Sequence, residues 1–130
     1  MRYLTDEELE LATRFLFLSM AMVVIRQDIG HAQNSASKLK EFHVRTLEKM
    51  ETEAAFERRN LKTLMRKKNM KIVTLNKNDS FSSFLFLCQG REEKRNYFNP
   101  AIRNKVAAIV QELTLKVLQS YQQENTAAKI

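Results

Sequence analysis

The stretch FLFLSMAMVVI, from Phe15 to Ile25, is apolar at every position except Ser19. A helix on a protein surface buries one apolar stripe, whereas a helix that is apolar all round must be covered on several sides. We therefore expect this segment either at the centre of a multi-helix core or shared between two copies of the chain. It is too short to cross a bilayer, which needs about 20 apolar residues, and the acidic residues before it do not fit a signal peptide.

The start of this helix is marked by the sequence LTDEEL. Thr5 can accept a hydrogen bond from an unpaired backbone amide of the first turn, and Glu8, three residues later, can accept one from the backbone of Thr5. This pair is a capping box. The helix is expected to run to about Asp28 and to stop at Gly30, a residue that suits a helix C-terminus.

Long helices are also favoured by the scarcity of turn residues, because the chain has two glycines and one proline in 130 residues. A second helix is predicted to begin near Ser35 or Ser37 and to continue to about Lys68. Such a helix would be roughly 48 Å long, whereas a compact domain of this size has a radius of gyration of about 14 Å. It should therefore extend beyond its own domain, be kinked, or pack against a second copy. Glu57, which interrupts its apolar stripe, could meet His43 of that copy in an antiparallel pair. A partly buried His43 with a backbone or water partner is the simpler interpretation.

The segment after the second helix is predicted to be a β-hairpin. Residues 70–75 are rich in β-preferring types, residues 76–80 have turn chemistry, and residues 83–88 form a short apolar run. A helix beginning at Ser80 is the competing interpretation, because Phe81, Phe84, Leu85 and Cys88 also have helical spacing.

The last third of the chain is predicted to be helical. REEKRNYF, residues 91–98, reads as a short helix, and Asn99 with Pro100 opens a longer one. From Gln122 onward a frayed polar tail is expected, residues 122–130. The predicted fold class is mainly α with a small β-hairpin, in the order helix, long helix, hairpin, helix, in one domain of residues 1–121.

The formal charge of +7 comes from one segment. Between Arg58 and Lys77 there are eight basic residues and no acid, which leaves 14 basic and 15 acidic residues elsewhere. A solvated face that opposes the helix dipole is the simpler explanation. The alternative explanation is a binding site for a polyanion, because several of these cations span an arc of about 100° beside the apolar stripe. The candidate polyanion-binding residues are Arg58, Arg59, Lys62, Arg66 and Lys71.

No catalytic, cofactor or metal signature is present in the sequence. Glycines at only Gly30 and Gly90 exclude the Gly-rich phosphate loops. The single Cys88 makes no internal disulfide, so a cytoplasmic location is the default. A thiol–imidazole couple of Cys88 with His31 or His43 lacks any motif context, and this set is too small for a zinc site.

The stretch FLFLCQGREEKRNYFNP, from Phe84 to Pro100, resembles a strand-to-helix junction in small uncharacterised proteins of Gram-positive spore-formers and their phages. Where relatives of that type would place an aromatic residue after the glycine, this sequence has Arg91. The resemblance supports the hairpin and implies no activity.

The function predicted from these features is a non-catalytic protein-interaction module that associates with itself as a dimer, with no membrane association and with a further protein partner that the sequence does not identify. A nucleic-acid-binding regulator that uses the basic segment Arg58–Lys77 is the alternative, and an enzyme is a distant third. The residues expected to mediate self-association are Phe15, Leu16, Met20, Val23, Leu47, Met50, Leu61 and Leu64.

Overall fold

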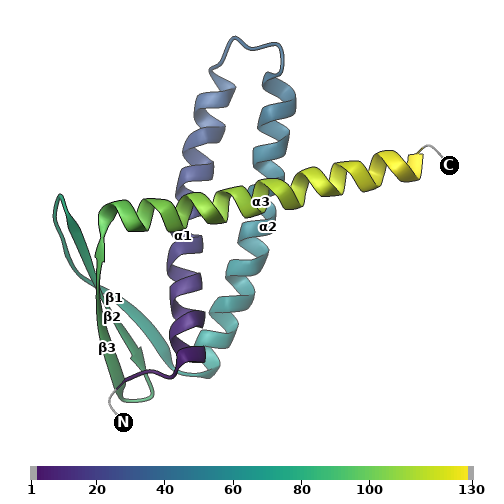
Figure 1. Cartoon of the computed structure of the whole chain (residues 1–130). Helices are drawn as coiled ribbons and strands as arrows, with labels where there is room; N and C mark the ends of the chain where they lie inside the picture. The colour runs from purple at the N-terminus through teal and green to yellow at the C-terminus, as the bar shows by residue number, and fades with distance from the viewer. Residues whose placement is uncertain (1–2, 129–130) are drawn as a thin grey trace.

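The computed structural model describes residues 3–128, with side chains as far as Glu124. Two long helices form an antiparallel hairpin, a sheet lies beside the end of the hairpin where the first helix begins, and the last helix crosses the hairpin (Figure 1). The elements in chain order are α1 (Asp6–Gln33), α2 (Lys40–Lys67), β1 (Met70–Lys77), β2 (Phe81–Cys88), β3 (Arg91–Phe98) and α3 (Asn99–Ala128).

The predicted fold class is wrong at residues 91–98, which form β3 and not a short helix. The hairpin is therefore part of a three-stranded antiparallel sheet in the order β1-β2-β3. β3 pairs with β2 along its whole length, from Phe98 opposite Phe81 to Arg91 opposite Cys88. Gln89 and Gly90, with φ of 52° and 79°, supply the two positive φ angles of a tight hairpin turn. The polar sequence of β3 does not indicate a strand. An edge strand is stabilised by pairing with its neighbour more than by an apolar pattern of its own.

The end of α1 and the start of α2 differ from the prediction, whereas α2 ends at Lys67, close to the predicted Lys68. α1 passes Gly30 and ends at Gln33, and α2 begins at Lys40, later than Ser35 or Ser37. Each has 28 residues, or about 42 Å of helix, so each covers the other along its length. The predicted overhang of the second helix is therefore absent, and its length no longer argues for a second copy.

The segment expected to be a frayed tail, residues 122–130, is helical over its described part. α3 remains helical to Ala128, while residues 129 and 130 lie outside the described residues. Lys49 of α2 holds this part of α3, because its Nζ lies 4.3 Å from the centre of the Tyr121 ring and 4.0 Å from Glu124 Oε1. A polar stretch can thus continue a helix when a neighbouring helix supplies partners.

α1 is the centre of the fold, as its apolar sequence predicted. It contacts α2, α3 and the strands β1 and β2. The larger core cluster lies where the three helices meet, with Leu18, Ile25 and Ala54 fully buried. The smaller cluster lies between α1 and the sheet, where alternate residues of β2, including Phe84 and Phe86, point inward. A single chain therefore covers most of the apolar helix, although Val23 stays 51% exposed.

Substitutions on the inward face of the sheet should lower the free energy of unfolding much more than substitutions on its outward face. Phe86 is fully buried and Phe98 is 51% exposed. Phe86→Ala is expected to lower the free energy of unfolding by about 3–5 kcal/mol, because it opens a cavity beneath the sheet. The matched control Phe98→Ala should cost much less. Urea unfolding followed by circular dichroism measures both, and equal costs would contradict the assigned strand faces.

Candidate functional site

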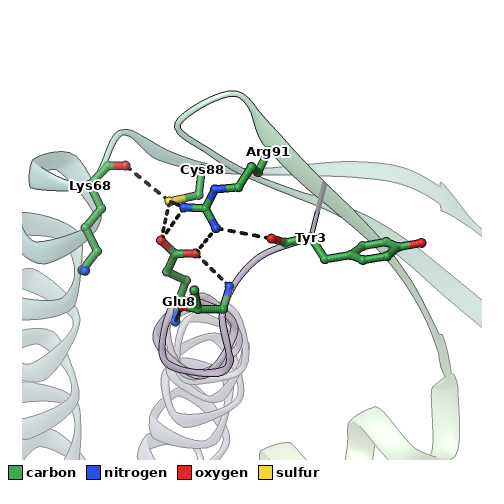
Figure 2. A network of polar contacts seen from close by, with 6 residues as sticks. Tyr3, Glu8, Lys68, Cys88 and Arg91 are labelled. Carbon is green, nitrogen blue, oxygen red and sulfur yellow. Dashed lines mark hydrogen bonds and ion pairs between the residues drawn. The ribbon is translucent and has the colours of Figure 1, made fainter. Parts of the chain in front are cut away.

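A cluster of polar contacts surrounds Glu8 near the start of α1 (Figure 2). The Thr5 amide donates to Glu8 Oε1 at 2.8 Å and the Glu8 amide donates to the Thr5 hydroxyl at 3.2 Å, so the predicted capping box is confirmed. Arg91, the first residue of β3, donates to both carboxylate oxygens of Glu8 at 2.6 and 2.7 Å. The Cys88 thiol donates to Glu8 Oε2 and to the Lys68 carbonyl, each at 3.4 Å. The cluster joins the start of α1 to the end of α2 and to the β2–β3 turn.

The charge state of this cluster is fixed by its own contacts. The bonds from Arg91 and from the Thr5 backbone hold the pKa of the Glu8 carboxyl well below its usual range, although burial opposes them. Burial raises the pKa of the Cys88 thiol, and the Glu8 carboxylate raises it further. A general acid or base needs a pKa near the working pH, and a nucleophilic cysteine needs a thiolate. An ionised Glu8 beside a protonated Cys88 suits a structural clamp and not a reactive pair.

A thiol–imidazole couple, a metal site and a membrane-spanning helix were also considered from the sequence, and none of them is seen in residues 3–128. Cys88 lies at the end of the hairpin where α1 begins, whereas His31 and His43 lie beside the α1–α2 connection at the opposite end (Figure 1). Within that range no three His, Cys, Asp or Glu side chains gather as metal ligands would. Within it, too, no helix combines the length and apolar content that crossing a bilayer requires.

A second polar network ties the three helices together where they cross. Arg14 of α1 donates to Glu57 of α2, through Nε at 2.6 Å and Nη2 at 3.0 Å, and Nη2 also donates to Glu112 of α3. The hydrogen bonds that Arg14 donates to these two carboxylates raise the pKa of its guanidinium. Glu57 is therefore satisfied inside one chain, and the exposed His43 has no part in it.

The five predicted polyanion-binding residues divide into two groups. Arg58 is half-buried, because its Nε donates to Ser19 Oγ at 2.9 Å and its guanidinium lies 4.6 Å from the centre of the Phe15 ring. The other four are exposed, and none of them forms a salt bridge within the described part of the chain. These free cations are Arg59, Lys62 and Arg66 on the outer face of α2, and Lys71 on β1.

The eight residues predicted to mediate self-association are mostly used inside the chain. Leu47 and Met50 are 5% and 2% exposed, so they offer no surface to a partner. Four others are partly buried against the two core clusters: Phe15, Leu16, Met20 and Leu61. Val23 and Leu64 are 51% and 46% exposed and remain available.

Sequence-based reasoning missed several exposed apolar side chains. Phe56 of α2 is 60% exposed, on the side of the helix away from its buried stripe. Phe81 and Phe98 pair across β2 and β3 on the outer face of the sheet, with ring centres 5.4 Å apart. An aromatic residue outside the stripe of an amphipathic helix was the available signal for Phe56. No signal was available for Phe98, because its strand was predicted as a helix.

The comparisons with known proteins point to one family. A family model described as YhjD protein matches residues 3–118. The uncharacterised protein YhjD of Bacillus subtilis (strain 168) is 28% identical over 107 residues, which cover 82% of this chain and 89% of that protein. No solved structure matches the chain.

The Glu8–Arg91 pair should make stability depend on pH in the acidic range. A glutamate in the unfolded chain has a pKa of about 4.3, and the folded pKa of Glu8 is lower. The pair therefore stabilises the fold fully above about pH 5, and this stabilisation declines as the pH falls toward the folded pKa. Glu8→Gln should lower the free energy of unfolding near neutral pH and flatten its dependence on pH in acid, as measured by urea unfolding.

The matched control for this variant is Glu53→Gln. Glu53 forms a salt bridge with Lys116 at 2.9 Å, but both side chains are largely exposed, and such surface pairs contribute little. The control should leave the stability and its pH dependence almost unchanged. If Glu8→Gln behaved in the same way, Glu8 would not be a buried clamp.

Proposed function

This chain belongs to the YhjD protein family, and from its own surface we propose that it is a non-catalytic interaction module that associates with itself as a dimer. The resemblance to small uncharacterised proteins of Gram-positive bacteria is confirmed at that level. The link to phages and the cytoplasmic location stay predictions. The family carries no activity that could be transferred to this chain.

The observation that supports the proposal best is the apolar surface that remains uncovered in the monomer. Among the described residues, twelve large hydrophobic side chains are at least 38% exposed. Some of them share the outer face of the sheet, where Val73, Phe81 and Phe98 alternate with inward-facing residues. Single exposed apolar residues are ordinary, but adjacent ones such as Phe81 and Phe98 mark interaction surfaces. The exposed apolar residues on the outer surfaces of α2 and the sheet, and not the length of the second helix, therefore support association.

Nucleic-acid binding is the second candidate, and one observation favours it. Arg59, Lys62, Arg66 and Lys71 are exposed and have no acidic partner among the described residues. Unpaired cations on one helix and the following strand suit contacts to phosphates, which carry no base specificity by themselves. Lys and Arg side chains in solvent are also common, so this candidate depends on a binding measurement.

The dimer is tested by sedimentation velocity at micromolar concentrations. We expect a species of twice the 15.2 kDa monomer mass, with a fraction that rises with concentration, because the exposed apolar side chains lose contact with water on association. A monomer at all concentrations would refute the proposal.

The nucleic-acid candidate is tested by retention of generic duplex DNA at low salt. If four cations contact phosphates, the slope of log affinity against log salt should be about −3.6, at roughly −0.9 for each phosphate. Absence of retention at low salt would remove this candidate.

A further inference from the structure

One face of α2 is left largely exposed by the rest of the chain, although Ala55 at its centre is partly buried against the larger core cluster. α1 meets α2 on the side of Glu57 and Arg58, and α3 meets it on the side of Glu53, the partner of Lys116. The face between these sides carries a line of residues spaced alternately by four and three positions, which keeps them aligned along a helix. From the N-terminal end, this outer stripe consists of Glu41, Arg45, Glu48, Thr52, Ala55, Arg59, Lys62 and Arg66.

Charge is divided along the outer stripe. Its N-terminal half contains Glu41 and Glu48, with Arg45 as the one cation, and Glu51 lies beside it. Its C-terminal half contains only cations, the free residues of the basic segment. The middle is uncharged, and Phe56, 60% exposed, lies next to Ala55 there. The stripe therefore has an acidic end, a small and aromatic centre, and a basic end.

The two ends are complementary when a second copy runs in the opposite direction. Glu51 and Arg59 are each four residues from Ala55, and Glu48 and Lys62 are each seven residues from it. An antiparallel copy aligned at Ala55 places each carboxylate opposite a cation of the other copy, and the two-fold axis repeats both pairs. A parallel copy would place like charges together, which is unfavourable.

These charges are available for such contacts. Glu48, Arg59 and Lys62 are exposed and form no salt bridge among the described residues. Glu51 has one partner, Arg26, at 3.2 Å, in a pair that solvent reaches. At the centre, Ala55 is partly buried against the larger core cluster, and its small side chain lets a second helix approach closely, while Phe56 beside it is 60% exposed.

We propose that two copies of this chain associate through the outer stripe of α2, antiparallel and centred on Ala55. This inference rests on the proposed function and names its partner and its surface. It also gives Arg59 and Lys62, two of the eight cations of the basic segment, acidic partners on the second copy. A polyanion would compete for the same cations, so the two uses of Arg59 and Lys62 can be separated by experiment.

The decisive variants reverse one end of the outer stripe at a time. R59E/K62E replaces two cations of the basic end with acids, and E48K/E51K replaces the two acids that would face those cations with lysines. Each should weaken the dimer at least about tenfold, because four attractive contacts per dimer become repulsive. Sedimentation equilibrium at low ionic strength measures the dissociation constant, and circular dichroism confirms that each variant is folded.

Rescue is the sharper part of the test. The quadruple variant E48K/E51K/R59E/K62E restores opposite ends in the reversed order, so it should dimerise again. An equimolar mixture of the two double variants should form a heterodimer, because the acids of one variant then face the cations of the other. Simple damage to the fold or a change in net charge would not produce either result.

Matched controls place the same change of charge elsewhere on the surface. K71E/K77E on β1 changes the net charge as R59E/K62E does, and D79K/E92K matches E48K/E51K, with all four of these control positions exposed. The controls should leave the dissociation constant within about twofold of the wild type. Weakening by the controls equal to that of the stripe variants would overturn the inference.

The remaining outcomes separate the two proposals. A wild type that stays monomeric overturns the proposed function and the inference together. A wild-type dimer that R59E/K62E and E48K/E51K leave intact, or a folded quadruple variant that stays dissociated, overturns the inference alone. If R59E/K62E abolishes retention of duplex DNA and leaves the dimer unchanged, the basic end is a polyanion site and the inference also fails.

Discussion

The fold depends on covering α1, whose middle is apolar on every side. One neighbouring element cannot cover all sides of this helix. α2 packs along its whole length, α3 crosses it, and the sheet lies beside its first half (Figure 1). Burial of this helix at about 25 cal/mol per Å² of apolar surface is the main driving force for association of the elements. It also explains why the chain has two core clusters, because the sheet and the crossing helix cover different parts of α1.

Polar contacts at the edges of α1 then fix how each neighbour sits. Arg14 bridges Glu57 and Glu112, which sets the place where α3 crosses the hairpin. Glu8 binds Arg91, which fixes the sheet against the start of α1. Apolar burial alone is not directional, whereas a bidentate Arg–carboxylate pair has a defined geometry. The two arginines therefore supply the orientation that the apolar core lacks.

Local signals in the sequence identified α1, its capping box and the β1–β2 hairpin, because each depends on residues a few positions apart. β3 could not be found in this way. Its residues are polar and its stability comes from pairing with β2, a contact that is visible only in three dimensions. The same limit affects the residues predicted to mediate self-association. Leu47 and Met50 are buried in the core of the monomer, and the periodicity of a sequence does not distinguish a helix face buried in a core from one buried in an interface. The partner of Glu57 was missed because Arg14 belongs to another helix.

Because the core buries most of the apolar residues of α2, few remain on its surface to form a dimer interface. Most apolar residues of α2 pack inside the chain, so the outer stripe is mainly charged, and Phe56, next to its centre, is a large exposed aromatic residue. Ion pairs at a solvent-exposed rim contribute little affinity and are screened by salt, but they strongly disfavour the wrong orientation. A dimer built on this surface would therefore be specific in its antiparallel register, moderate in strength and sensitive to ionic strength. Such an interface suits reversible association better than an obligate dimer, whose interface would resemble a core.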